Sequence, residues 1–273
     1  MPAQKTILVT GASSGNGQAA ARFLSQRGHQ VFGTSRNPSA AEEIPGVTLV
    51  TLDVRSDDSV AACVKTVLEQ AGHLDVLVNN AGYELGGALE ELSIEEARAQ
   101  FETNFFGVAR MVKAVLPAMR REKRGQIVNI GSLSGLAPIP FLGMYSASKF
   151  ALEGYTEALR HEVKPFNIQV SLVEAGFLKT PLREKRQLAA ERVSEYDSWR
   201  QRALDAIREQ EEKGPGPELV ADTVIRIIES RKPRLRYAVG RQARLISTLR
   251  RFLPEAAFEQ GTRSTFHLGV NRK

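Results

Sequence analysis

Cysteine, histidine and tryptophan are scarce in this chain of 273 residues. It contains one cysteine, Cys63, four histidines and one tryptophan. A single cysteine excludes a disulfide within the chain, and no Cys/His spacing matches that of a zinc site. We therefore expect no metal centre.

Long apolar runs are also missing. No apolar stretch approaches the ~20 residues that a transmembrane helix needs. The strand-like residues 6–10 begin too close to Met1 to leave room for a signal peptide, so we expect a cytoplasmic protein. The hydrophobic fraction of 42% and the charged fraction of 25% are those of an ordinary globular protein.

Acidic residues are fewer than basic ones, which gives a net charge of +6. Such a balance permits binding to nucleic acid or to an anionic membrane. No nucleic-acid motif accompanies it, and we expect no nucleic-acid partner. For the basic amphipathic stretch 241–251, packing on its own domain is the favoured interpretation, and attachment to a membrane surface is the alternative.

Short β-branched runs alternate with longer amphipathic stretches, a pattern typical of βαβ units. The expected strands are residues 6–10, 30–34, 47–52, 74–78, 125–130, 168–173 and 234–239. The expected helices are residues 18–27, 57–70, 93–121, 143–163 and 218–230. This alternation predicts an α/β fold, a single Rossmann-type doubly wound parallel sheet of about seven strands flanked by helices.

One domain with an extension accounts for the whole pattern. We expect a dinucleotide-binding and catalytic domain over residues 1–240, with residues 181–216 as a substrate lid in which Trp199 could point inward. Residues 241–273 would form a C-terminal extension that loses its pattern after the basic stretch. In the long helix 93–121, Ser93 and Glu96 have the spacing of a capping box, and we expect Pro117 to bend the helix.

A glycine-rich loop separates the first expected strand from the first helix. Residues 10–17 read TGASSGNG. Glycine lets the backbone turn tightly and approach a pyrophosphate, and a helix N-terminus offers unpaired N–H groups. A structural turn could use the same residues, but the position between a strand and a helix favours nucleotide binding.

Tyr145 and Lys149 are four positions apart in an expected helix, so their side chains share one face. A free tyrosine has a pKa near ~10, too high for a base at neutral pH. A nearby ammonium, together with an oxidised nicotinamide ring, would lower that pKa. Tyr145 could then give a proton to a carbonyl oxygen or take one from an alcohol. Such pairs also occur by chance on surfaces, so this one alone does not identify a site.

Several motifs together resemble the short-chain dehydrogenase/reductase family. The glycine spacing is G-x-x-x-G-x-G, residues 79–82 read NNAG, and residues 145–149 read YSASK. Asn104 and Ser132 also fall at the family's places, and the resemblance covers residues 5–180. The sequence of residues 145–154, YSASKFALEG, is similar to that found in the branch of the family that contains hydroxysteroid and retinol dehydrogenases.

The resemblance implies roles for four residues. Tyr145 would be the general acid/base, and Lys149 its partner, which also binds the nicotinamide ribose. Ser132 would hydrogen-bond the reacting oxygen, with Ser134 as its rival. Asn104 would hold a water that connects Lys149 to solvent, or would be a buried amide that braces its helix. The resemblance also implies a homodimer or homotetramer, paired through helices 93–121 and 143–163.

The end of the second strand bears on the choice of cofactor. Residues 33–37 read GTSRN, with no acid before Glu42. An acid there would bind a ribose 2′-hydroxyl, whereas Arg36 offers a planar fork of donors to a 2′-phosphate. Stacking of Arg36 on the adenine is the alternative. We expect NADP(H) in preference to NAD(H).

The expected cofactor site combines these residues with others that the resemblance implies. Asp53 and Val54 would flank the adenine, Asn80 would hold the far ribose region, and Thr180 could bond the nicotinamide carboxamide. The full set is Gly11, Ser13, Ser14, Gly15, Asn16, Gly17, Ser35, Arg36, Asp53, Val54, Asn80, Ala81, Gly82, Tyr145, Lys149, Gly176 and Thr180.

The residues between Ser132 and Tyr145 are nearly all apolar. They would suit a bulky hydrophobic ketone or secondary alcohol, and a subunit interface is the alternative for part of the run. The sequence thus predicts an NADP(H)-dependent oxidoreductase that interconverts a carbonyl and an alcohol by hydride transfer. The competing hypothesis is a non-catalytic NADP(H)-binding sensor or scaffold, which need not keep the acid/base group.

Overall fold

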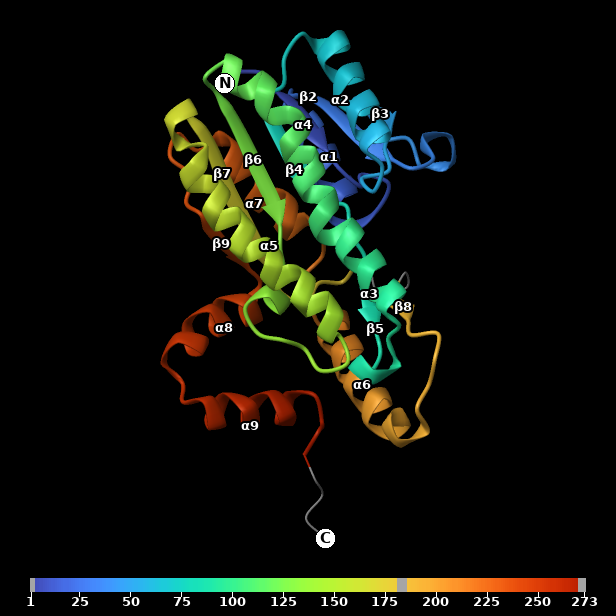
Figure 1. The fold of residues 1–273 in the computed structure, drawn as a ribbon. Helices are drawn as coiled ribbons and strands as arrows, with labels where there is room; N and C mark the ends of the chain where they lie inside the picture. Colours follow the sequence, from blue (N-terminus) through green and yellow to red (C-terminus); the bar gives the residue numbers. More distant parts are fainter. Residues whose placement is uncertain (1–2, 181–185, 270–273) are drawn as a thin grey trace.

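The computed structural model describes residues 3–180 and 186–269, and its centre is a parallel sheet (Figure 1). In the order β3-β2-β1-β4-β6-β7-β9, seven strands pair in parallel within these residues. They are β1 (Thr6–Val9), β2 (Gln30–Ser35), β3 (Val47–Thr51), β4 (Val76–Asn79), β6 (Gly125–Ile130), β7 (Ile168–Ala175) and β9 (Arg236–Val239). The predicted fold class is confirmed.

The strand order reverses between β1 and β4. The chain moves outward from β1 through β2 to β3, then returns to pair β4 on the other side of β1. In open α/β sheets, ligands bind in the crevice at the carboxyl ends of the strands at such a switch point. This geometry places the ends of β1 and β4 at the site described below.

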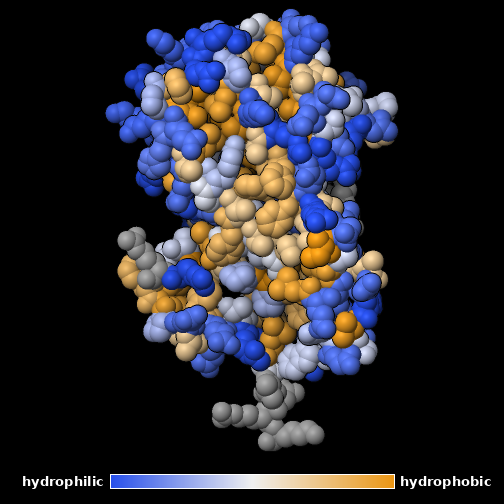
Figure 2. All heavy atoms as spheres, in the orientation of Figure 1, coloured by the Kyte–Doolittle hydropathy of each residue, from blue (hydrophilic) through white to orange (hydrophobic). Residues whose placement is uncertain are grey.

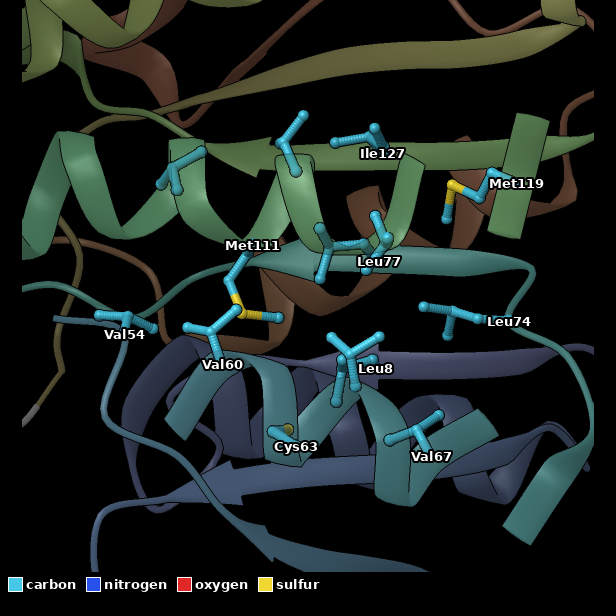
Figure 3. Packing of buried hydrophobic residues seen from close by; sticks show 14 of the residues in the cluster. Leu8, Val54, Val60, Cys63, Val67, Leu74, Leu77, Met111, Met119 and Ile127 are labelled. Atoms are coloured by element: carbon cyan, nitrogen blue, oxygen red, sulfur yellow. The ribbon is translucent and has the colours of Figure 1, made fainter. Parts of the chain in front are cut away.

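Helices cover both faces of the sheet because its central strands are apolar on both sides. Helices α2 (Asp57–Ala71), α4 (Gly107–Arg121) and α5 (Gly143–Glu162) cover one face. Helices α1 (Gly15–Gln26) and α7 (Glu218–Glu229) cover the other. Figure 3 shows the first layer, where Cys63 of α2 and Met111 of α4 pack beside Leu8 and Leu77 of the sheet.

The long helix expected over residues 93–121 is helical throughout but not uniform. It consists of α3 (Ile94–Phe101), a π-helical segment (Glu102–Phe106) and α4. The predicted capping box is confirmed: the backbone N–H of Ser93 donates to Glu96 (2.8 Å), and that of Glu96 donates to the Ser93 hydroxyl (3.1 Å). Pro117 lies inside α4, and a bend there stays a prediction.

Some predicted boundaries were wrong. Helix α1 begins at Gly15 rather than three residues later, with Ser14 at its N-cap. Strand β7 continues through Glu174 to Ala175, because the Glu174 carboxylate has Arg236 of β9 as its partner (2.6 Å). A small sheet of β5 (Leu85–Gly86) and β8 (Gln187–Leu188) was not foreseen, since two-residue strands carry no periodicity.

The predicted lid contributes one helix, α6 (Asp197–Glu212), and its residues 181–185 lie outside the described residues. Short 3-10 helices complete the fold at Pro38–Ala40, Leu89–Glu91, Leu133–Gly135, Lys164–Phe166 and Ser194–Tyr196. No helix within residues 3–180 and 186–269 is long and apolar enough to cross a bilayer.

The C-terminal extension forms α8 (Arg241–Phe252) and α9 (Glu255–Thr265), seen below the body in Figure 1. The prediction that the pattern ends after the basic stretch was wrong, because α9 is helical despite its internal Gly261 and few apolar residues. At the end of α9, Phe266 is buried in one cluster with Leu142, Tyr145 and Ile207. On α8, Leu245 and Phe252 remain exposed.

Candidate active site

A cavity of about 540 Å³ lies at the carboxyl ends of the central strands. Its wall contains every sequence-predicted site residue except Gly17 and Asn104. The predicted residues that line it are Gly11, Ser13, Ser14, Gly15, Asn16, Ser35, Arg36, Asp53, Val54, Asn80, Ala81, Gly82, Ser132, Tyr145, Lys149, Gly176 and Thr180. The topology therefore brings together residues that are up to 169 positions apart (Gly11 to Thr180, 180 − 11).

The glycine loop forms one end of the cavity. Gly11 and Gly15 have φ angles of +67° and +58°, in the left-handed region that favours glycine. The backbone N–H of Gly11 donates to the Thr34 hydroxyl of β2 (3.1 Å). The loop is thereby fixed to the sheet with the N-terminus of α1 directly behind it, which is the arrangement that binds phosphate groups.

Gly17 and Asn80 both support this loop, and Asn80 also lines the cavity, whereas Gly17 does not. A Cβ on Gly17 would lie 2.3 Å from the Gly11 carbonyl oxygen, so only glycine lets α1 approach so closely. The Asn80 amide donates to the carbonyl oxygens of Thr10 (3.0 Å) and Gly11 (3.1 Å). Its donors therefore hold the loop in shape.

The rim near β2 and β3 carries two arginines. Arg36 is exposed directly after β2. Arg55, which the sequence reasoning missed, donates to both carboxylate oxygens of Asp53, at 2.9 Å and 2.6 Å. These hydrogen bonds lower the pKa of Asp53 to about 2. The Asp53 carboxylate, which also feels the charge of Arg36, is thus already paired with another cation.

Tyr145, Lys149 and Ser132 meet in the middle of the cavity. Tyr145 and Lys149 are buried, and the Lys149 ammonium lies 5.8 Å from the centre of the Tyr145 ring. The Tyr145 hydroxyl is hydrogen-bonded to Ser132. The Ser132 hydroxyl in turn lies 3.2 Å from that of Ser134 and accepts a bond from the Ser134 backbone N–H. Ser132 is therefore the serine in contact with Tyr145, and Ser134 stands behind it.

The electrostatics of this group differ from the expectation. Burial, and then the Glu84 carboxylate, raise the pKa of Tyr145. Burial lowers the pKa of Lys149 to about 8, because its ammonium is withdrawn from water. The ammonium donates a hydrogen bond to the Ile130 carbonyl oxygen (2.9 Å). We expected a lowered pKa for Tyr145, but the protein groups by themselves raise it, so this part of the prediction was wrong. The part assigned to the nicotinamide ring stays a prediction.

Asn104 lies behind the cavity wall, in the π-helical segment. Its amide exchanges hydrogen bonds with the backbone of Tyr83, donating to the carbonyl oxygen (3.0 Å) and accepting from the N–H (3.1 Å). It also donates to the Ser148 hydroxyl (3.3 Å). These contacts support the interpretation of a buried amide that braces the loop after β4 against α5.

A buried ionic group that the sequence reasoning missed closes the opposite end of the cavity. Arg186 contacts Glu84 at 2.7 Å and Glu211 at 2.5 Å, and all three side chains are about nine-tenths buried. Glu84 and Glu211 line the cavity. We call this group the carboxylate bridge. Its members are 102 and 25 positions apart, so no local spacing could have revealed it.

The rest of this end is apolar. Ile139, Leu142, Phe177, Leu178 and Ile207 line it, which confirms that part of the apolar run after Ser132 forms a pocket. Among the described residues that line the cavity, Trp199 is not found. It lies half-buried against Arg202 instead, with the guanidinium 5.2 Å from its ring centre.

Comparisons with known proteins agree with this geometry. The model of the short chain dehydrogenase family matches residues 5–191. The 3-ketodihydrosphingosine reductase of Bacteroides thetaiotaomicron is 45% identical over 237 residues, 86% of this chain and 87% of that protein. Retinol dehydrogenase 8 of Bos taurus is 41% identical and covers 86% of this chain and 81% of its own.

Solved structures share the whole fold. A short-chain dehydrogenase from Streptomyces avermitilis superposes with a TM-score of 0.81 at 33% identity, over 97% of this chain and 99% of its own. One from Burkholderia phymatum, in complex with NAD, has a TM-score of 0.79 at 26% identity, over 94% and 95%. ElxO with NADP bound has a TM-score of 0.72 at 26% identity, over 87% and 97%.

Proposed function

This chain belongs to the short-chain dehydrogenase/reductase family, and we propose that it is an NADP(H)-dependent oxidoreductase that interconverts a hydrophobic ketone and its secondary alcohol. One observation carries the proposal: the hydrogen-bonded pair of Ser132 and Tyr145, with Lys149 beside it, in the wall of a cavity at the switch point of the sheet. A sensor or scaffold would not need this buried group.

The residues around the glycine loop fit a dinucleotide. A Cβ on Gly11 would lie 2.9 Å from the Ala81 backbone, so this part of the loop leaves room only for glycine beside the cavity. The buried Asn16 side-chain oxygen has no hydrogen-bond partner among the described residues, and it could accept one from a hydroxyl group of the cofactor. When bound, the nicotinamide supplies or accepts the hydride.

Side chains of the protein would transfer the proton to the substrate oxygen. In the reducing direction, the Tyr145 hydroxyl donates its proton to the substrate oxygen, and the Ser132 hydroxyl holds that oxygen in place. The raised pKa of Tyr145 keeps it protonated at neutral pH, as a general acid must be. Lys149 gives one N–H to Ile130, which leaves two donors for a ribose hydroxyl.

We further propose that NADP(H) is preferred. Solved relatives bind either NAD or NADP, so the fold accommodates both. Arg36 at the rim supports the phosphorylated cofactor, because Asp53, the acid near this rim, already has Arg55 as its partner. A guanidinium whose neighbouring carboxylate is already paired with another arginine favours a 2′-phosphate.

The same proposal includes a homo-oligomer. Figure 2 shows hydrophobic residues gathered on the face over α4 and α5. Phe106, the last residue of the π-helical segment before α4, and Phe150 of α5 are 47% and 40% exposed, and a second copy of the chain would cover them. Sedimentation velocity of the purified chain would distinguish a dimer or tetramer from a monomer.

The decisive experiment follows NADPH consumption with a panel of hydrophobic ketones, with NADH in parallel. We expect turnover that prefers NADPH and falls by at least ~100-fold in Tyr145→Phe, which keeps the ring and removes the proton. Tight NADPH binding without turnover of any ketone, or of any alcohol in reverse, would favour the sensor or scaffold instead.

A further inference from the structure

Glu91 is a buried carboxylate that takes no part in the proposed proton transfer. Its side chain is 1% exposed, and it ends the 3-10 helix Leu89–Glu91. One carboxylate oxygen accepts a hydrogen bond from the backbone N–H of Ala88 (2.8 Å). The other accepts from the backbone N–H of Val193 (3.1 Å) and from the Arg200 guanidinium. Donors on both oxygens hold the carboxylate in one orientation.

These contacts tie the loop after β5 to the start of α6, across 109 positions of the chain. Val193 precedes α6, and Arg200 lies near its N-terminus. The Arg200 side chain is buried and also contacts Asp197, whose side chain is about half-exposed. Because a buried charge is costly without its partner, the pair of Glu91 and Arg200 opposes any movement of α6 away from the loop.

Other contacts attach the chain before α6 to the same region, which lies at one end of the molecule (Figure 1). β8 pairs with β5, and the backbone N–H of Ala189 donates to the Gly86 carbonyl oxygen (2.8 Å). The backbone N–H of Ala190 donates to the Glu96 carboxylate (3.0 Å). These contacts end before α6, so the contact between Glu91 and Arg200 is the one of this group that holds the helix itself.

Helix α6 carries part of the apolar wall of the cavity. Ile207 lines the cavity and comes about two helical turns after Arg200, on the same face of α6. Ile207 also belongs to one buried cluster with Leu142 and Tyr145. Fixing the start of α6 therefore fixes the wall beside the residue that would transfer the proton to the ketone.

Building on the proposed function, we infer that Glu91 is a positioning residue for the ketone, which it affects by holding α6 through Arg200. The glycine loop is held by other residues, Thr34 and Asn80, so cofactor binding does not depend on Glu91. Loss of the Glu91 carboxylate lets α6 shift and weakens the apolar contacts of the ketone, before and during the reaction alike. Such a loss raises KM and leaves kcat unchanged.

The variant Glu91→Gln tests this inference. Glutamine has one oxygen in place of two, so its amide nitrogen must face one of the donors. Arg200 keeps Asp197 as a partner, so its charge is not left unpaired. With saturating NADPH at pH 7, we expect KM for the ketone to rise by at least about tenfold, the value of a lost charge-assisted hydrogen bond. We expect kcat and KM for NADPH to stay within about threefold of wild type.

The substrate is decan-2-one, or the panel ketone with the highest kcat/KM if the wild type reduces another ketone better. Arg200→Met should raise its KM as Glu91→Gln does. Arg200→Lys keeps a cation for Glu91 and should hold KM within about threefold of wild type. Glu90→Gln is the matched control, because Glu90 belongs to the same 3-10 helix but is exposed and accepts from the Tyr196 hydroxyl (2.8 Å). Fluorescence titration with NADPH shows whether each variant is folded.

Each other outcome has a distinct meaning. An unchanged KM for the ketone in Glu91→Gln and Arg200→Met would overturn the inference and leave the proposed oxidoreductase intact. Equal rises in KM for the ketone and NADPH, an equal rise in Glu90→Gln, or no rescue by Arg200→Lys would also overturn it. Loss of NADPH binding in both Glu91→Gln and Arg200→Met would make the pair structural and overturn it as well. If the wild type reduces no ketone of the panel, the proposed function itself is contradicted, and the inference with it.

Discussion

At the scale of single residues, the two arginines at the cavity rim differ in what they contact. Arg55 binds Asp53 through two hydrogen bonds, so its charge is used within the protein. Arg36 is exposed at the same rim. The difference makes Arg36 the residue expected to set the cofactor preference.

Replacing Arg36 with alanine should therefore raise KM for NADPH by about 10- to 100-fold, the value of a charge-assisted hydrogen bond. KM for NADH should change by less than about threefold, since no phosphate is lost. Initial-rate kinetics with both cofactors measure this. Arg27→Ala, which removes an exposed arginine paired with Glu229, is the control. Equal losses with both cofactors would point to stacking on the adenine.

Glu153, one helical turn after Lys149, is a buried carboxylate in a second ionic group. Arg236 contacts Glu153, Glu174 and Glu157 together, so three carboxylates share one cation. Burial raises the pKa of Glu153 to about 7 from an ordinary 4.5. Between pH 4.5 and 7, the folded protein therefore holds a proton that the unfolded chain has released.

The free energy of unfolding should fall as the pH rises through this window, by on the order of 2 kcal/mol from this group. Glu153→Gln should remove that part of the pH dependence. Compared with the wild type, the free energy of unfolding of the variant should therefore be higher at pH 8 than it is at pH 4.5. Urea unfolding across this range, with Glu95→Gln as the surface control, measures the difference. Parallel curves for wild type and Glu153→Gln would show that Glu153 does not titrate there.

At the scale of the elements, the cofactor loop depends on how closely α1 approaches β1. Gly17 permits the approach, because any side chain there would meet the Gly11 carbonyl oxygen and the Asn80 amide, at 2.3 Å and 2.4 Å. The π-helical segment likewise positions a side chain that holds two elements together. It contains Asn104, whose amide ties the loop after β4 to α5.

Gly17→Ala should accordingly displace the glycine loop and weaken NADPH binding by at least about tenfold, since the loop backbone must move to accept the methyl group. Fluorescence titration with NADPH measures the affinity. Gly261→Ala, at a helical glycine of α9 with open space around it, should leave binding unchanged. Unaltered affinity in Gly17→Ala would mean that the loop adapts without loss.

At the scale of the whole molecule, the C-terminal extension packs behind the apolar end of the cavity. Phe266, directly after α9, is buried in one cluster with Ile139, Leu142 and Ile207. All three of these residues line the cavity. The extension therefore supports the apolar wall of the cavity.

Phe266→Ala should leave a void in this cluster at a cost of about 3 kcal/mol to the packing of the extension. We expect a raised KM for long-chain ketones and an unchanged KM for NADPH, which separate kinetic titrations measure. Phe252→Ala, at a side chain 74% exposed on α8, is the control and should behave as wild type. A raised KM for NADPH would show that the extension also supports the cofactor end.

The sequence by itself determined the parallel sheet, the capping box at Ser93, the position of the glycine loop and the shared face of Tyr145 and Lys149. Each depends on local spacing, which periodicity and helix geometry translate directly into structure. The motif residues also proved to surround one cavity, because the carboxyl ends of parallel strands meet at one edge of the sheet.

Tertiary structure alone decided the rest. Glu84 and Arg186 are 102 positions apart, and Phe266 lies in the same buried cluster as Tyr145, more than a third of the chain away. The direction of the Tyr145 pKa depends on burial, a property of the packed fold that no spacing encodes. Contacts between distant side chains, and the desolvation that accompanies them, arise only when the elements pack.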